Sequence, residues 1–184
     1  MTAARALAEL ARWGLLLLQD KTLPNLAALV AGETVRGSWW GHSSGHEIFR
    51  IAGELEDHGD VAIAKLVSGK VTFVHRRLFA ALVDAGVRAD DAGVSPDARA
   101  LLETVRREGS GVRGKGKPVK ELETRLLVHG HQVHTDSGRH ETELEAWPTF
   151  AARVGVAAGA REDLEGAVAE MNRAVGGNGK LPWQ

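Results

Sequence analysis

Apolar positions recur at helical spacing through the first part of the chain. Residues 3–18 are predicted to form a helix with four apolar side chains on one face: Leu7, Ala11, Leu15 and Leu18. Pro24 and Gly32 bracket a second, short helix, because proline suits a first helical turn and glycine suits a helix end. The segment 46–59 keeps the helical period and stops at Gly59. The sequence therefore predicts three helices before the first strand.

The hydrophobic pattern then changes to that of a β-hairpin. Two β-rich runs flank Ser68-Gly69, a dipeptide that suits a two-residue hairpin turn. The register of such a turn places four apolar residues on one face: Ala64, Leu66, Val71 and Phe73. A helix follows and ends at Gly86, and the polar loop 87–94 is the best candidate for a domain boundary.

The second half opens with a strong helix signal. Ser95 is predicted to be the N-cap, Pro96 the first helical residue and Gly109 the end of this helix. The stretch 110–118, SGVRGKGKP, is predicted to be a glycine-rich basic loop. A helix restarts beyond it with three apolar residues in line: Val119, Leu122 and Leu126.

A second hairpin is predicted around Ser137-Gly138. Its expected register pairs residue 134 with Glu141 and residue 135 with His140. That register brings three histidines to one face: His129, His131 and His140. Helices are predicted to follow from about Pro148 and over residues 160–175. An apolar anchor, Leu181 and Trp183, ends the tail.

Composition narrows the class of protein. The chain has 184 residues, of which 43 % are hydrophobic, enough to build a core. It has no cysteine, so disulfides and thiolate metal sites are excluded. The apolar run from Gly14 is too short to span a membrane. The acids within the first helix argue against a secretory signal. We therefore expect a cytoplasmic protein without a membrane segment.

Positive charge gathers in the middle of the sequence although the net charge is −1. Residues 65–125 hold 13 basic and 8 acidic residues, whereas the flanking segments 1–64 and 126–184 each hold 5 basic and 8 acidic residues. Such an asymmetry indicates an anionic partner. The alternative is a solvated basic face with no ligand.

The order of elements over residues 95–154 resembles a winged-helix domain, which is a three-helix core with a β-hairpin wing. The resemblance covers about a third of the chain and rests on helix, short basic loop, helix, hairpin and helix. It implies DNA binding, with a recognition helix in the major groove and the wing on the backbone, or a protein-interaction module. The sequence departs from the DNA-binding pattern because Glu121 and Glu123 lie beside Lys120 and Arg125 in the second helix.

These patterns together predict an α+β fold. Its helical N-terminal half, residues 1–88, carries a small β-hairpin. Residues 95–156 form a winged-helix-like domain, and residues 160–184 form a C-terminal helix and tail. No internal repeat is present in the sequence.

The candidate nucleic-acid-binding residues are a basic group and a tryptophan pair. The basic residues are Arg76, Arg77, Arg106, Arg107, Arg113, Lys115 and Lys117, with Lys120 adjoining them. Their side chains suit phosphate, and the glycines between them let the backbone approach it. Trp39 and Trp40 precede a helix N-terminus and suit base stacking. The alternatives are a solvated linker, pairing of Arg76 and Arg77 with the acidic segment 54–60, and tryptophans packed inside the protein.

Five histidines are the weaker candidates for metal binding: His42, His46, His129, His131 and His140. His42 and His46 have the spacing of zinc-binding helices, but Ser44 and Glu47 match a capping box, which places a helix start between them. Glu47 is then expected to be a reciprocal cap rather than a general base. The alternative for the other three histidines is a polar strand face.

The sequence favours a nucleic-acid-binding protein, with DNA as the preferred partner, in repair, regulation or defence. One alternative is a metal- or anion-dependent enzyme that uses the clustered histidines. Another is a protein-interaction module without catalysis. No complete catalytic motif, phosphate-binding loop or cofactor motif is present. We therefore expect no cofactor, and catalysis and oligomeric state stay open.

Overall fold

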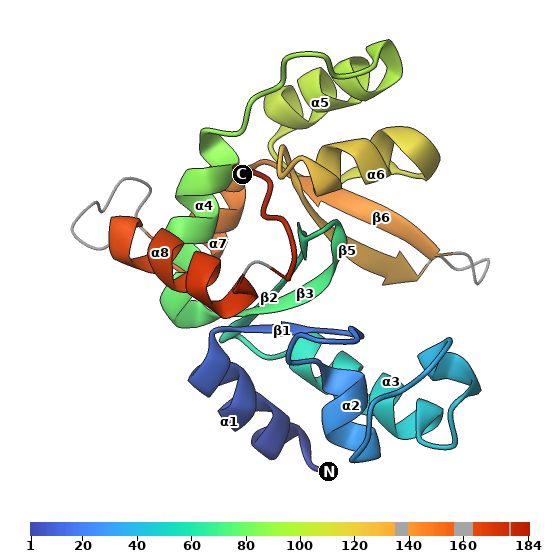
Figure 1. Cartoon of the computed structure of the whole chain (residues 1–184). Coiled ribbons are helices and arrows are strands. Elements are labelled where there is room, and N and C mark those ends of the chain that lie inside the picture. Colours follow the sequence, from blue (N-terminus) through green and yellow to red (C-terminus); the bar gives the residue numbers. More distant parts are fainter. Residues whose placement is uncertain (135–139, 157–163, 177) are drawn as a thin grey trace.

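The computed structural model describes residues 1–134, 140–156, 164–176 and 178–184. It is an α+β fold, as predicted, and its strands form two small three-stranded antiparallel sheets (Figure 1). The first half comprises α1 (Ala3–Trp13), β1 (Leu15–Leu17), α2 (Leu26–Ala31), the 3-10 turn η1 (Trp39–Gly41), α3 (Gly45–Glu56), β2 (Val61–Val67), β3 (Lys70–His75), the 3-10 turn η2 (Arg76–Leu78) and α4 (Phe79–Val87). The second half comprises α5 (Pro96–Glu108), β4 (Val112–Gly114), α6 (Gly116–Thr124), β5 (His129–His134), β6 (His140–Glu145), α7 (Trp147–Val154) and α8 (Leu164–Val175).

The first helix ends earlier than the sequence predicts. Gly14 has a φ of +79° and closes α1, and its N–H donates to the Leu10 carbonyl. The leucines that follow form β1, an edge strand paired with β3 in the order β1-β3-β2. Leu16 packs with α1 and α3, whereas Leu15 and Leu17 pack with α4 on the other face. A strand buried on both faces reads as a continuous apolar run, which is why it resembled part of a helix.

The first hairpin has the predicted turn and a different register. Ser68 and Gly69 both have positive φ, 52° and 68°, as a type I′ turn requires. Val67 pairs with Lys70 as expected, but the register shifts between Ala64 and Val67. Ala64 and Phe73 therefore belong to different core clusters, and the prediction that they share a face is wrong.

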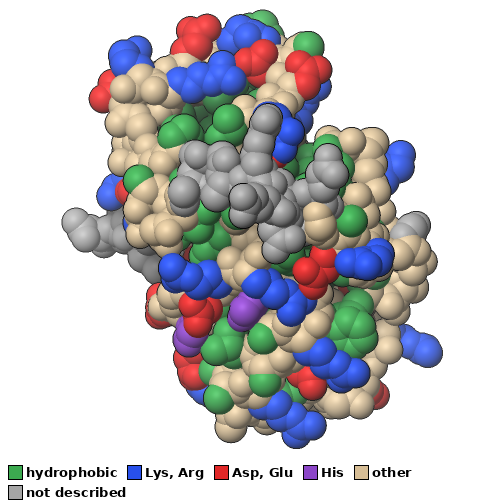
Figure 2. Space-filling model, turned by 90° about the vertical axis from the view of Figure 1, so that its left-hand side faces the viewer, with side chains coloured by type: hydrophobic (Ala, Val, Ile, Leu, Met, Phe, Trp, Pro, Cys, Tyr) green, Lys and Arg blue, Asp and Glu red, His purple; other side chains and the backbone are tan. Residues whose placement is uncertain are grey.

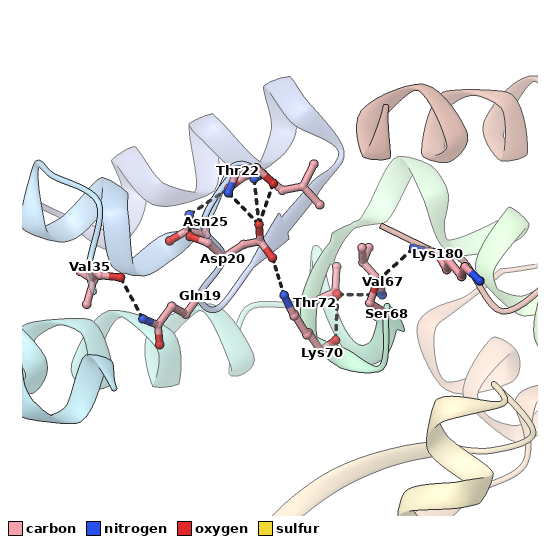
Figure 3. Close-up of polar contacts among 11 residues, drawn as sticks. Gln19, Asp20, Thr22, Asn25, Val35, Val67, Ser68, Lys70, Thr72 and Lys180 are labelled. Atoms are coloured by element: carbon pink, nitrogen blue, oxygen red, sulfur yellow. Dashed lines mark hydrogen bonds and ion pairs between the residues drawn. The ribbon is translucent and has the colours of Figure 1, made fainter. Parts of the chain in front are cut away.

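A buried carboxylate fixes the loop between β1 and α2 (Figure 3). Asp20 Oδ1 accepts hydrogen bonds from the backbone N–H groups of Thr22 and Leu23, at 2.9 and 3.0 Å. Asp20 Oδ2 accepts a bond of 2.6 Å from Lys70 Nζ on β3. Asn25, the N-cap of α2, donates to the carbonyls of Asp20 and Leu23. The polar side chains of this loop therefore bond within the protein and hold the loop against the first sheet.

The second sheet has the order β4-β6-β5. Strand β4 lies inside the stretch 110–118 that was predicted to be a loop, and α6 begins at Gly116. Ser95 is the N-cap of α5 and Pro96 its first residue, as predicted, and Gly109 is the C-cap. The helix predicted from about Pro148 is α7, and that predicted over 160–175 is described from Leu164.

The register of the second hairpin differs by one residue from the prediction. His129 pairs with Glu145, His131 with Glu143, and position 134 with position 140. Position 140 therefore belongs to the alternate set of strand positions, not to the set that holds His129 and His131. The expected grouping of all three histidines on one face is wrong. The predicted turn at Ser137-Gly138 lies outside the described residues.

The largest core cluster draws on both halves and on the C-terminal segment. It includes Leu82 of α4, Phe150 of α7, Met171 of α8 and Leu181 of the tail. Gly86 lies against Trp147, since a Cβ there would be 2.2 Å from Trp147 Nε1. Gly86 thus permits α4 and α7 to pack closely. It is not the last residue of its helix, since α4 ends at Val87. No helix of the described residues has the length and apolar character needed to cross a membrane.

Candidate nucleic-acid interface

Helix α6 presents three lysines at its N-terminal end. The chain enters it through Gly116, whose φ of +77° is a value that favours glycine. Val119 and Leu122 pack the inner face of the helix into the core of the second half. Three side chains are left exposed: Lys115, Lys117 and Lys120. Within the part of the chain that the structure describes, their ammonium groups have no hydrogen bond or ion pair.

The two acids of α6 are bonded to other elements of the protein. Glu121 accepts hydrogen bonds from the Ser95 hydroxyl at 2.6 Å and the Ser95 N–H at 3.0 Å. These bonds, the hydroxyl first, hold the pKa of Glu121 below its ordinary value. Glu123 is buried and pairs with Lys65 of β2. Glu121 and Glu123, which in the sequence argued against phosphate binding, are therefore bonded to other residues of the protein. The exposed N-terminal part of α6 is basic.

The candidate arginines beside α6 have acidic neighbours. Their closest N–O distances are 2.8 Å for Arg106 and Asp91, 2.9 Å for Arg107 and Glu108, and 3.9 Å for Arg113 and Glu143. All three arginines are more than half exposed, so these pairs are weak and can exchange for another anion. Figure 2 shows basic and acidic side chains side by side at the end of the molecule that carries α5.

Arg76 lies at the junction of β3 and α4, away from α6. Its guanidinium is 3.8 Å from the Asp60 carboxylate and donates at 3.1 Å to the Val154 carbonyl of α7. The predicted alternative, pairing with the acidic segment 54–60, is confirmed for this residue. The neighbouring His75 has a lowered pKa, first because it is partly buried and then because Arg77 lies close to it.

Arg77 joins the first and last helices. It donates to the Ala11 and Arg12 carbonyls at the end of α1, and it pairs with Glu170 of α8. A cation at the C-terminal end of a helix is favourable because the last carbonyls there lack helical partners. Arg76 and Arg77 therefore bond to other residues of the protein, and they do not lie beside the lysines of α6.

The tryptophan pair lies beside α3, and Figure 1 shows α3 at the opposite end of the molecule from α5 and α6. Trp39 and Trp40 stack with ring centroids 4.2 Å apart, and Phe49 lies 5.2 Å from Trp40. Trp40 is 60 % exposed and Phe49 is 53 % exposed. Trp39 also contacts a small core cluster that includes Ile48. One ring is thus partly packed, the other is open to solvent, and neither approaches the basic face.

The helix start between His42 and His46 is confirmed, but the capping box is not. Ser44 is the N-cap of α3 without a side-chain capping bond, and its N–H donates to His42 Nδ1 at 3.1 Å. Glu47 pairs instead with the Met1 amino group at 3.1 Å. His42 Nε2 lies 3.5 Å from Glu33, and His46 is exposed on α3.

His129 and His131 form a group with a residue that the sequence did not single out. One ring nitrogen of each and one carboxylate oxygen of Glu145 lie within 4.8 Å of one another. His129 Nδ1 is 2.9 Å from Glu145 Oε1, and Arg153 also donates to this carboxylate. Burial acts to raise the pKa of Glu145, but the bonds to His129 and Arg153 outweigh it and lower the pKa to about 2. The alternation of acids along β6, opposite H-x-H, was the available signal.

The comparisons with known proteins give no relative. No family model, no curated protein and no solved structure matches this chain. The functional argument therefore depends on the geometry of the residues described above.

Proposed function

We propose that this chain binds nucleic acid, with duplex DNA as the favoured form, through the exposed face of α6. The observation that carries the proposal is the contrast within that helix. Its lysines are exposed with no bonded partner among the described residues, whereas both of its acids are engaged elsewhere. A helix face of this kind suits the phosphate backbone, because each ammonium group that neutralises a phosphate releases a condensed counterion and so favours binding.

The N-terminal end of α6 adds to the attraction. The first N–H groups of a helix have no helical acceptor and favour an anion. Pro118 has no N–H, so the remaining N–H groups of that turn supply this attraction. Arg113 on the preceding strand is 56 % exposed, and its distant partner Glu143 leaves it available for phosphate. Lys115, Lys117, Lys120 and Arg113 would thus position the duplex without reading its sequence.

The winged-helix resemblance supports the same face. The order α5, β4, α6, β5–β6 hairpin and α7 keeps three helices and a hairpin in sequence. In that arrangement α6 would occupy the place of the recognition helix, and the hairpin that of the wing. The proposed interface excludes Arg76 and Arg77, whose guanidinium groups donate hydrogen bonds to backbone carbonyls of other elements. It also excludes Trp39 and Trp40, which lie at the other end.

Fluorescence anisotropy of a labelled duplex at low salt tests the proposal. We expect wild-type protein to bind, and the variant K117E/K120E to bind on the order of 10²-fold more weakly, because two phosphate contacts become repulsions. The control R5E/K21E changes the same net charge at exposed residues outside α6 and is expected to change affinity only slightly. Absence of wild-type binding, or an equal loss in the control, contradicts the proposal. Single-stranded DNA and heparin as competitors show whether duplex is preferred.

A further inference from the structure

The face of the β5–β6 hairpin that packs against α7 carries two histidines and two glutamates at directly paired positions. His129 is opposite Glu145 and His131 is opposite Glu143. Residues two apart on a strand lie on the same side, so all four belong to one face. Arg113 of the proposed nucleic-acid interface lies at the edge of this face, 3.9 Å from Glu143, but none of these four residues belongs to that interface.

Each imidazole has one ring nitrogen beside a carboxylate and one that is buried and unpaired. His129 Nδ1 is 2.9 Å from Glu145 Oε1, and His131 Nε2 is 3.8 Å from Glu143 Oε1. The other nitrogens, His129 Nε2 and His131 Nδ1, are buried without a hydrogen-bond partner among the described residues. Buried polar atoms without a partner are rare in folded proteins and indicate a bound water or ion. Imidazole nitrogens and carboxylate oxygens are both metal ligands.

We propose that His129, His131 and Glu145 hold a divalent transition metal ion, with zinc as the best fit to two imidazoles and one carboxylate. One potential ligand atom from each residue already lies within 4.8 Å of the other two. Zinc ligands lie about 2.0–2.2 Å from the ion, so two of them are at most about 4.4 Å apart. Small side-chain rotations therefore close the site. Three protein ligands leave a further position for water or another ligand.

The surroundings of the group restrict how it can move. His129 is 6 % exposed and packs against both Phe150 and Trp147 of α7, with ring centroids 4.5 and 5.7 Å away. Glu145 is 3 % exposed. Two of the three ligands are therefore held in place by packing, and the third, His131, is on the more open side with 41 % of its side chain exposed. A site with two fixed ligands and one accessible ligand can be filled from solvent.

Arg153 is the competitor for this site. Its guanidinium pairs with the Glu145 carboxylate, and its side chain is 55 % exposed. An ion at Glu145 has to share or displace this cation. Arg153 can move into solvent, where its charge is well hydrated. Removal of the Arg153 charge is therefore expected to strengthen metal binding, whereas a role confined to the Glu145–Arg153 ion pair predicts no such gain.

Calorimetric titration of the chelator-treated full chain with zinc chloride tests the proposal, and visible absorption with cobalt(II) reports the ligand set. We expect one strong site per chain. H131A is expected to weaken zinc binding at least about tenfold, and H46A, an exposed histidine on α3, is expected to leave it unchanged. H131C keeps a ligand at this position and is expected to retain zinc. R153Q is expected to bind more tightly than wild type.

The proposal is overturned if the wild type takes up no zinc. It is also overturned if H131A binds zinc as tightly as the wild type and H46A do. It is also overturned if H131C behaves as H131A does while both variants keep the wild-type circular dichroism spectrum. The experiment is independent of nucleic-acid binding. A failure of either proposal is therefore distinguishable from a failure of the other.

Discussion

The cations at the start of α4 and those at the start of α6 look alike in the sequence and differ in what holds them. Arg77 bonds to two carbonyls of α1 and to Glu170, and Arg76 bonds to Asp60 and Val154. The lysines of α6 have no such bonds among the described residues. A cluster of positive charge in a sequence therefore does not identify a binding surface. The availability of that charge in the fold does.

The same contrast holds for the two sheets. The first sheet, β1-β3-β2, is buried on both faces and uses its polar groups, such as Asp20 and Lys70, to fix a loop. The second sheet, β4-β6-β5, carries ionisable side chains on one face, and its buried nitrogens at His129 and His131 lack partners. The polar side chains of the first sheet are thus bonded within the fold, whereas the second sheet has buried nitrogens that can bind a ligand.

The largest expected effect tests whether these two regions share one core. In G86A, the added Cβ would lie 2.2 Å from the Trp147 indole, which is buried and cannot move aside. We expect a loss of about 3 kcal/mol in the free energy of unfolding, because overpacking forces the helices apart. Urea denaturation followed by tryptophan fluorescence and circular dichroism measures it. Two separate transitions would show that the regions unfold independently, and no loss would contradict the close packing of Gly86 against Trp147.

D20N tests the role of polar groups in the first sheet. At neutral pH we expect a loss of about 2 kcal/mol, because the substitution breaks the bond to Lys70 and weakens those from Thr22 and Leu23. Burial acts to raise the pKa of Asp20, but the bonds from Lys70, Leu23 and Thr22 outweigh it and hold the pKa below its ordinary value.

The sign of the pH dependence follows from that shift. A lowered carboxyl pKa stabilises the folded chain above the ordinary value near about 4, and the stabilisation is lost as the pH falls through the folded value. The difference in thermal midpoint between wild type and D20N is therefore expected to be full at neutral pH and to shrink below about pH 4. A difference that grows on acidification would contradict this account of Asp20.

R77A is expected to have a smaller effect, a loss of about 1 kcal/mol, because it leaves the Ala11 and Arg12 carbonyls without their donor. Its affinity for DNA is expected to equal that of wild type. The matched control is R12A, whose side chain is 70 % exposed with an acid 3.7 Å away, and which is expected to change stability very little. Thermal denaturation and anisotropy on the same samples separate the two roles.

Local signals in the sequence were sufficient for most elements, and most of the missed features have non-local causes. The Ser68-Gly69 turn and the start of α5 follow from residues that are adjacent in sequence. The end of α1 at Gly14 also has a local cause, a capping glycine with positive φ, but the strand β1 depends on burial between two core clusters. The shift after Ala64 and the register of the second hairpin depend on packing against other elements, which periodicity alone does not report.

The candidate site was predictable in composition and not in orientation. The basic character of residues 113–120 was evident from the sequence, and so was the H-x-H pair on β5. The sequence did not show that Glu121 would bond Ser95, or that Glu145 would join His129 and His131. Side-chain direction follows from tertiary contacts, so acids that appeared to oppose a phosphate partner proved to be part of the scaffold.

The salt dependence of duplex binding tests the central claim most directly. In a plot of log affinity against log salt concentration, K115A/K117A/K120A is expected to show a slope shallower than wild type by about 3, because each phosphate contact contributes about 0.9. R76A/R77A is expected to keep the wild-type slope. A wild-type slope in the lysine variant together with a shallower slope in the arginine variant would contradict the account and place the contact at the start of α4.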